Sequence, residues 1–421
     1  MAGYTAVPVV LVAAALCLVS YLALPVGTQQ DRHFFVANEE HGQVEHVSDV
    51  EISAITGRTV HSTQEANNKE YQAGLNESVK EGSKDLLLGL FLQANGTEIN
   101  GLSENLKELA KTIPDLLCNS KADSTVKKYY YNFKKWVLWA SSNDVCVFPA
   151  KPIHLCLYCS FLVQTGASKG VLNDVFYGIR WAHNIVGLPS PTDSLLVKNL
   201  FEGAKRKLCK PVIKKDVMTV EILEKMYDKH FDGKDLVAQR IITISLLCYA
   251  GFLRSAEVLN LMRCDIQLSS THTELFIEQS KTDIYRDGSW VLIARTDNKL
   301  CPVRNLKIYL QLAEISDSSS EYIFRNVTKC KDRYTLRKCN KPMIYSRLRV
   351  SFLHHFSSVV PDISKYGLHS CRAGGATAAA NGGVVDRLFK RHGRWRSETA
   401  KDGYVKDSVV ERLSVSQNLG L

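Results

Sequence analysis

A basic segment with a proline at its centre divides the patterned part of this 421-residue chain into two halves. It reads Lys205-Arg-Lys-Leu-Cys-Lys-Pro-Val-Ile-Lys-Lys, and Pro211 cannot continue a helix. Before it, apolar residues recur every three or four positions, the period of an amphipathic helix; after it, such runs alternate with short strand-like stretches. Because the chain is also too long for one ordinary domain, we predict a helical unit over residues 116–208 and an α+β unit over residues 216–421.

Charge is distributed unevenly along the chain. In total, the chain contains 53 Lys and Arg and 43 Asp and Glu, which gives a net charge of +10. Residues 1–112 hold 7 basic and 14 acidic residues, so residues 113–421 hold 46 basic and 29 acidic residues, a net charge of +17. A basic globular region behind an acidic leader favours a polyanionic partner, and nucleic acid is the first candidate.

The amino-terminal apolar run, residues 6–26, has three interpretations. It is uncharged and just long enough to cross a bilayer, for which about 20 residues are needed. No basic residue precedes it and no clear cleavage site follows it, which weakens the case for a secretory signal. A membrane anchor, a short buried helix and a cleaved signal within residues 1–30 therefore stay open.

Residues 31–115 are polar and acidic with few aromatic side chains. Such a composition buries too little apolar surface to offset the entropy of folding. We predict a flexible, mostly disordered spacer with one modest amphipathic helix over residues 101–111, and we expect order to begin near Ser120.

The first half is predicted to be all helical. In the helix that begins near Ser124, the apolar side chains form one stripe and four lysines fall on the opposite side. A lysine face is ordinarily only solvated. Given the basic charge, we nevertheless take it, with the basic segment, as the candidate DNA-binding surface of this half: Lys127, Lys128, Lys134, Lys135, Lys205, Arg206 and Lys207. Further helices are expected over residues 151–165, 168–186 and 193–208.

Cys156 and Cys159 form a C-x-x-C pair inside an apolar run. A zinc site needs further ligands, and no second pair lies at zinc spacing. We therefore expect buried thiols on a core helix and no metal. Twelve cysteines without a disulfide framework suit a reducing compartment.

The second half is predicted to mix helices with a small antiparallel sheet. Helical runs cover residues 219–230 and 234–249. Two alternating stretches over residues 273–279 and 290–296 predict a hairpin, with turn residues near Arg286. From about residue 302 to the end we expect helices.

Five short motifs of this half contain side chains suited to phosphate chemistry. Taken singly, each has an ordinary explanation: an i,i+3 ion pair, an exposed turn lysine, close packing of small residues or one tyrosine among 17. Their order and spacing are less ordinary. The residues, in chain order, are Arg254 with Glu257, Lys281, His369 with Arg372, His392 with Trp395, and Tyr404 nine residues after Trp395.

This order resembles the tyrosine recombinase (phage integrase) family from about residue 120 to the carboxyl end. The string HSCRAGGATAAANGG is most similar to recombinases carried by eukaryotic mobile elements. The resemblance implies a mainly α fold with a small antiparallel sheet. It also implies a helical core-binding domain of the SAM-like type and an α+β catalytic domain, which together clamp a DNA duplex.

The implied activity is that of a site-specific DNA recombinase or integrase, which cuts and rejoins DNA through a 3′-phosphotyrosine intermediate without metal, ATP or other cofactor. Two arginines, Arg254 and Arg372, suit bidentate contacts to phosphoryl oxygens. A tyrosine pKa near 10 leaves roughly one phenolate per thousand at neutral pH, so the nucleophile Tyr404 needs a base, for which we favour His369. By resemblance, Lys281 is the general acid for the leaving 5′-hydroxyl.

Two residues compete for the position that is His or Trp in the family. Trp395 has the expected spacing to Tyr404, whereas His392 lies twelve residues before it. We therefore prefer Trp395, whose indole can only donate a hydrogen bond and would hold the phosphate. Glu257 is expected to orient Arg254 or its neighbours without direct chemistry.

The expected partner is double-stranded DNA, and by resemblance the protein self-assembles as a tetramer on two duplexes. The expected location is the nucleus. The alternative is a catalytically silent DNA-binding protein derived from a mobile-element recombinase. A third interpretation is a protein anchored in a membrane through residues 6–26.

Overall fold

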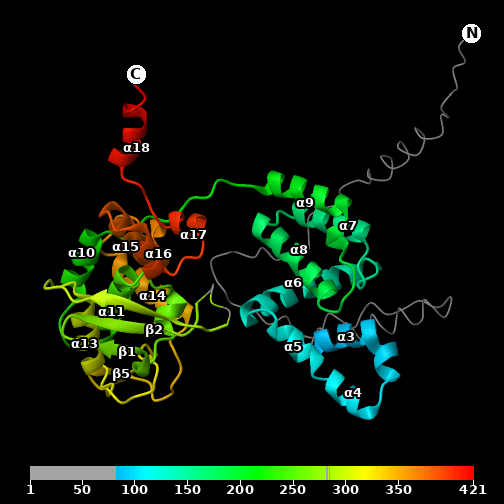
Figure 1. Ribbon diagram of the computed structural model, residues 1–421, viewed down its shortest axis with the longest axis horizontal. Helices are drawn as coiled ribbons and strands as arrows, with labels where there is room; N and C mark the ends of the chain where they lie inside the picture. The colour runs from blue at the N-terminus through cyan, green and yellow to red at the C-terminus, as the bar shows by residue number, and fades with distance from the viewer. Residues whose placement is uncertain (1–81, 281–282, 284) are drawn as a thin grey trace, which may run out of the picture. The chain divides into compact units, whose positions relative to one another are not determined.

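The structure, a computed structural model, describes residues 82–421 apart from residues 281, 282 and 284 (Figure 1). The apolar run at residues 6–26 lies outside the described residues. Among the helices that are described, none is both long enough and apolar enough to span a bilayer. Two large hydrophobic clusters, one on each side of the basic segment, form the cores of the two halves, and each half is described by itself.

The first half is all helical, as predicted. Its central helix α6 directs Phe133, Trp136 and Val137 into the core, all with 0% exposure. The indole of Trp136 donates a hydrogen bond of 2.9 Å to the carbonyl of Val147 and so fixes the loop after α6. The helices are α3 (Ser83–Asn100), α4 (Glu104–Ala110), α5 (Ile113–Asn119), α6 (Asp123–Ser142), α7 (Pro152–Gln164), α8 (Lys169–Asn184) and α9 (Leu195–Leu208).

The prediction of a disordered spacer over residues 31–115 is wrong from Ser83 onward. Helices α3, α4 and α5 precede Ser120, and Leu86 and Leu90 are fully buried in the same core as Phe133. The apolar run DLLLGLFL that supplies these residues is short, and the polar stretches around it hid it from a compositional argument. The modest helix expected over residues 101–111 is present as α4.

Cys156 and Cys159 lie on α7 and are buried in this core. Burial raises the pKa of both thiols, that of Cys159 to about 12. The prediction of buried core thiols is confirmed.

The second half is built around α11, of which most side chains are buried. Three strands form an antiparallel sheet in the order β1-β2-β3, with Leu275 opposite Val291 at the centre of the β2–β3 hairpin. Figure 1 shows the helices of this half around the sheet and α11. Up to the sheet, the elements are α10 (Val220–His230), α11 (Leu236–Ala250), α12 (Ser255–Leu259), β1 (Ile266–Leu268), β2 (His272–Ile277) and β3 (Ser289–Ala294).

The predicted hairpin is confirmed, but two features of the sheet structure were missed. Strand β1 is only three residues long, too short to show alternation. A second hairpin, β4 (Val327–Cys330) with β5 (Arg333–Leu336), lies where only helices were expected, because its strands are only four residues long and largely exposed. The remaining helices are α13 (Pro302–Leu312), α14 (Tyr345–Phe356), α15 (His369–Asn381), α16 (Asp386–Gly393), α17 (Glu398–Asp402) and α18 (Val409–Gln417).

Small residues allow α15 to approach α11 closely. A Cβ atom added to Gly374 would lie 1.9 Å from the carbonyl oxygen of Met218, and one added to Gly375 would lie 1.9 Å from that of Tyr249. Both distances are far inside van der Waals contact with backbone that cannot rotate away. The ordinary explanation of the small residues, close helix packing, is therefore confirmed for these two glycines.

Replacing Gly374 by alanine is expected to destabilise the protein by about 3 kcal/mol, the upper end for overpacking of a dense core. The free energy of unfolding, measured by chemical denaturation, tests this. Gly367→Ala is the matched control, because no atom lies within 4 Å of its added Cβ. Equal stability of the two variants would contradict the close approach.

Candidate active site

Arg254 and Glu257 form the first part of the site, at the start of α12. Glu257 reaches back to the helix start: its carboxylate accepts a hydrogen bond of 2.8 Å from the backbone N–H of Arg254 and one of 2.5 Å from Nη1 of the same residue. The Glu257 side chain is 2% exposed and that of Arg254 is 15% exposed. The guanidinium of Arg254 is therefore held in place and still reachable from solvent.

Three guanidinium groups surround the carboxylate of Glu257. Besides Arg254, Nη2 of Arg394 lies 2.9 Å from Oε2, and Nη1 of Arg372 lies 3.7 Å from the same oxygen. Burial by itself would raise the pKa of Glu257, but Arg394, the N–H of Arg254 and the other two guanidinium groups together lower it. One carboxylate and three guanidinium groups give this site a net positive charge, which suits an anionic ligand.

Arg372 is the most deeply placed of the three arginines. It comes from the first turn of α15, is 0% exposed, and donates to the carbonyl oxygens of Phe252 and, at 2.8 Å, Gly393. Burial and the nearby Arg254 lower its pKa to about 10, so it stays protonated at neutral pH. Its Nε, like Nε1 of Trp395, is buried and has no hydrogen-bond partner in the described part of the chain.

Tyr404 lies over this cationic group. The Cζ atom of Arg372 is 4.8 Å from the centre of the Tyr404 ring and 5.1 Å from that of Trp395. The ring of Tyr404 lies 5.7 Å from that of Trp395 and 6.5 Å from that of His369, which is exposed at the start of α15. Four of the predicted site residues, Arg372, His369, Trp395 and Tyr404, thus lie near one another.

The segment that carries Tyr404 is attached to α15 and α16 by polar contacts. Thr377 of α15 donates a hydrogen bond of 3.4 Å to the carbonyl of Tyr404 and accepts one of 3.1 Å from the N–H of Lys406. In α17, Lys401 pairs with Glu398 at 2.5 Å and with Asp386 of α16. Tyr404 itself is half-buried.

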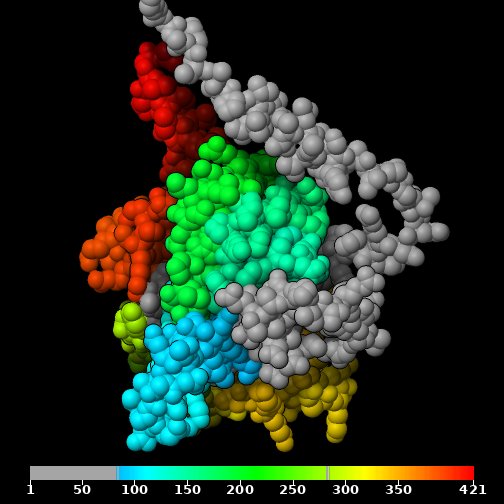
Figure 2. Space-filling view, turned by 90° about the vertical axis from the view of Figure 1, so that its right-hand side faces the viewer, coloured from blue at the N-terminus to red at the C-terminus, as the bar shows by residue number. Residues whose placement is uncertain are grey.

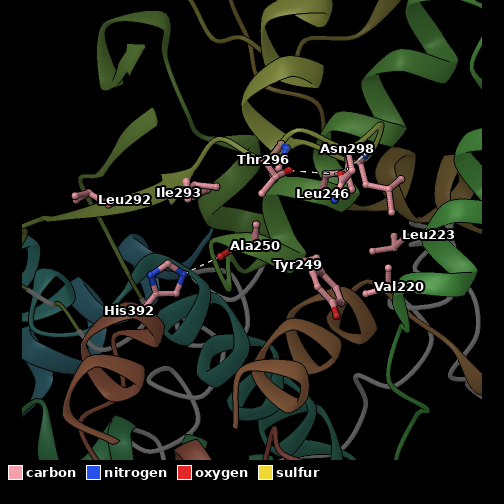
Figure 3. Close-up of a pocket in the computed structure, with 13 residues that line it drawn as sticks. Val220, Leu223, Leu246, Tyr249, Ala250, Leu292, Ile293, Thr296, Asn298 and His392 are labelled. Atoms are coloured by element: carbon pink, nitrogen blue, oxygen red, sulfur yellow. Dashed lines mark hydrogen bonds between the residues drawn. The ribbon is translucent and has the colours of Figure 1, made fainter. Parts of the chain in front are cut away.

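The geometry favours Trp395 over His392 as the neighbour of the phenol. Trp395 is 5% exposed and packs against Phe389 and Tyr404. His392 points elsewhere: its Nε2 donates a hydrogen bond of 2.7 Å to the carbonyl of Ala250, and it lines a neighbouring cavity of about 440 Å³ with Tyr249 (Figure 3). Burial lowers the pKa of His392, which suits a neutral ring beside a carbonyl.

Arg394 was missed by the sequence analysis. It has a left-handed backbone, with φ of 55°, at the carboxyl end of α16, and this turn directs its guanidinium inward to Glu257 and the carbonyls of Phe252 and His392. The only signal in the sequence was its place between His392 and Trp395, because a basic residue alone does not predict a left-handed turn.

Eight predicted site residues are not among the described residues of this cluster. Lys281 falls outside the described residues, so its role stays a prediction. The seven candidate DNA-binding residues belong to α6 and α9 of the first half. Two of them have partners there: Lys128 pairs with Asp174 at 2.7 Å, and Lys205 pairs with Glu202 and lies over the ring of Phe201. Arg206 and Lys207 are exposed.

Replacing Glu257 by glutamine is expected to destabilise the fold and to change its pH dependence. Loss of one partner from a buried ion pair costs on the order of 3 kcal/mol, since it leaves buried charge unpaired. Folding lowers the pKa of Glu257 from its ordinary 4.5, so the carboxylate stabilises the protein above that pH, and the contribution is lost as the pH falls through the lowered value. Chemical denaturation at neutral and acidic pH measures both effects.

The difference in stability between wild type and Glu257→Gln should therefore be largest at neutral pH and shrink in acid. Glu224→Gln is the control, because Glu224 is an exposed partner of Lys299 and such pairs contribute little. A difference that stays constant from neutral pH into acid would contradict the electrostatic role of Glu257.

Comparisons with known proteins place this geometry in context. No family model matches the chain. An integrase/recombinase xerD homolog of Selenomonas ruminantium is 24% identical over 329 residues, which cover 75% of this chain and 92% of that protein. Among solved structures, the XerH site-specific recombinase bound to palindromic difH substrate, in a post-cleavage complex, is 14% identical, with a TM-score of 0.53 over 84% of this chain and 96% of that one.

A lambda integrase dimer bound to a core site is 12% identical, with a TM-score of 0.45 over 72% of this chain and 95% of that one. The XerH comparison shows the fold, and the xerD homolog shows similarity in sequence over most of both chains. The resemblance predicted from the five motifs is therefore confirmed: this chain is similar in sequence to a xerD-type recombinase and has the tyrosine recombinase fold.

Proposed function

We propose that this protein is a site-specific DNA recombinase or integrase that cuts and rejoins double-stranded DNA through Tyr404. One observation carries the proposal: the phenol of Tyr404 lies over the guanidinium of Arg372, in a place where three arginines surround a single carboxylate. A nucleophilic oxygen beside an excess of positive charge is what an attack on a phosphodiester requires.

In the proposed step, the Tyr404 oxygen attacks the scissile phosphorus and the bond from phosphorus to the 5′ oxygen breaks. The phenol proton passes to His369, and the 5′ oxygen takes up a proton, which the resemblance assigns to Lys281. One ester bond is exchanged for another, so the 3′-phosphotyrosine keeps the energy of the broken linkage. Attack by a second 5′-hydroxyl then rejoins the strands without ATP.

The arginines and Trp395 would hold the phosphate during this exchange. Arg254 is accessible from solvent and fixed by Glu257, which suits a contact to a phosphoryl oxygen. Arg372 and Trp395 each keep a buried N–H without a partner in the described part of the chain, and such donors are costly unless an acceptor reaches them. Glu257 and Arg394 are positioning residues that act through Arg254 and Arg372.

Wild-type protein should form a covalent adduct with nicked duplex DNA, because the short fragment beyond the nick diffuses away after cleavage and rejoining is lost. A pool of nicked duplexes with randomised sequence serves as substrate, since it requires no known target. Denaturing electrophoresis should show the adduct for wild type and for Tyr131→Phe, a control at an exposed tyrosine of α6.

Tyr404→Phe should give no adduct at all. Arg372→Ala should reduce the rate of adduct formation by at least about 100-fold, as for removal of one preorganised electrostatic contact. DNA binding by wild type without any adduct would instead support the catalytically silent alternative. An adduct that persists in Tyr404→Phe would show that another residue is the nucleophile.

Self-assembly is also part of the proposal, and α18 supports it. This helix has no buried residue, although it carries Val409, Val410, Leu413 and Val415 with exposures of 72%, 75%, 49% and 69%. Burial of these side chains would gain about 25 cal/mol per Å² of apolar surface. We propose that α18 packs against a second copy of the chain, in a tetramer on two duplexes.

Replacing Val410 and Leu413 together by aspartate should weaken this assembly and leave the fold intact, since both side chains are exposed. Mass photometry on DNA-bound protein should show smaller complexes for the double variant than for wild type. The control is Ser414→Asp with Ser416→Asp, which adds the same charge to the same helix at polar positions. Equal masses for wild type and both variants would contradict an assembly role for α18.

We also propose the nucleus as the location of the protein, because a recombinase of a eukaryotic mobile element meets its DNA there. The apolar residues 6–26 stay open to the three interpretations given above, a membrane anchor among them.

A further inference from the structure

The segment from residue 326 to residue 349 carries a dense group of basic side chains. It contains eight Lys and Arg and one acidic residue, Asp332, a net charge of +7 against +10 for the whole chain. It comprises the β4–β5 hairpin, the loop after it and the start of α14. All eight basic residues are exposed: Lys329, Lys331, Arg333, Arg337, Lys338, Lys341, Arg347 and Arg349.

Little of this charge is neutralised by the residues that the structure describes. Nη1 of Arg333 pairs with Glu314 at 3.0 Å, and the other seven side chains have no ion pair with a described residue. Like charges at this density repel one another, and a polyanion would relieve that repulsion. In Figure 2 the gold-coloured part of the chain, which includes this segment, is seen at the lower edge of the view, and some of its atoms project outward.

The hairpin is a narrow two-stranded ribbon. Val327 and Leu336 at its base pack against the core, while the outer pairs Lys329–Tyr334 and Cys330–Arg333 are exposed. The major groove of DNA admits a ribbon of this kind, and phosphates on either side of the groove attract lysine and arginine. The shape and the charge of the hairpin therefore fit the same partner, duplex DNA.

The root of the hairpin is fixed to α11, the helix that also leads to the candidate active site. Nη1 of Arg240, near the amino end of α11, donates a hydrogen bond of 2.8 Å to the carbonyl of Arg325. Phe252 lies just beyond the carboxyl end of α11 and accepts from Arg372. At 1.5 Å per residue, Arg240 and Ala250 are about 15 Å apart along the helix, or about four to five base pairs at 3.4 Å each.

We propose that the β4–β5 hairpin and the loop after it are a second DNA-contact surface, which binds backbone phosphates several base pairs from the bond that Tyr404 cuts. This rests on the proposed function, since it takes a DNA duplex as the substrate. The surface contributes affinity and holds the duplex in register. It takes no part in the chemistry.

The test uses full-length protein and a hairpin variant, Lys329→Ala, Arg337→Ala, Lys338→Ala, which removes one exposed basic residue of β4 and two of the loop after β5. Binding to a long fluorescent duplex of mixed sequence is measured by anisotropy at several NaCl concentrations. The logarithm of the association constant falls linearly with the logarithm of the salt concentration, and each lost phosphate contact should make this slope less steep by about 0.9. The slope of the triple variant should therefore be less steep than that of wild type by about 2 to 3, and the variant should bind more weakly at every salt concentration.

The matched control removes three lysines from a surface of mixed charge: Lys225→Ala, Lys229→Ala and Lys234→Ala, near Glu224, Asp228 and Asp232. Its slope should stay within experimental error of wild type. Thermal unfolding should be unchanged in both triple variants, because the altered side chains are exposed. If the hairpin variant keeps the wild-type slope, or if both triple variants lose the same amount, the second contact surface is refuted.

Adduct formation separates this proposal from the function on which it rests. With saturating protein at low salt, the hairpin variant should still form the Tyr404 adduct on nicked DNA. An adduct in both proteins with equal salt slopes would overturn the hairpin proposal alone. A lower slope for the variant with no adduct in either protein would overturn the catalytic function and leave the hairpin as a DNA-binding surface.

Discussion

The buried carboxylate of Glu257 is the interaction on which the rest of the site depends. It is 2% exposed and fixes Arg254 through one hydrogen bond to each of its oxygens, while Arg394 and Arg372 approach Oε2, the oxygen that also accepts from the backbone N–H of Arg254. Without it, three guanidinium groups would share a place with little water and no counter-charge. The carboxylate makes their convergence possible, and its single charge leaves the surplus that a phosphate would neutralise.

Close packing brings these groups together from distant parts of the sequence. The two glycines of α15 let that helix touch the backbone of Met218 and Tyr249, so Arg372 reaches the carbonyl of Phe252 at the end of α11. The left-handed turn at Arg394, at the end of α16, directs the third guanidinium group to Glu257. Each contact is made by backbone or by a buried side chain. The arginine geometry is thus set by the core.

The sequence predicted the parts of this site that depend on order along the chain. Arg254, Arg372, Trp395 and Tyr404 were identified because their spacing resembles a known family, and the structure brings all four together. The sequence did not predict Arg394, because the direction of its side chain follows from the left-handed φ angle of its backbone. Helix α3 was also missed, because Leu86 and Leu90 lie in a short apolar run inside an acidic region. The β4–β5 hairpin was missed because strands of four residues are too short to show a clear alternating pattern.

Different contacts hold Tyr404 and the arginines, and this difference suits the proposed reaction. Arg372 is fully buried and bound to two carbonyl oxygens. The segment of Tyr404 is held by packing of its ring on Trp395 and Arg372, by two hydrogen bonds with Thr377, and by ion pairs of Lys401 with partly exposed carboxylates, which contribute little each. A tyrosine that must attack a phosphate and later release it needs to move relative to the groups that hold the phosphate. Shifting residue 404 would give up its ring contacts with Arg372 and Trp395, but it breaks none of the hydrogen bonds and ion pairs that position the arginines, so the cationic site can stay in place while the tyrosine moves.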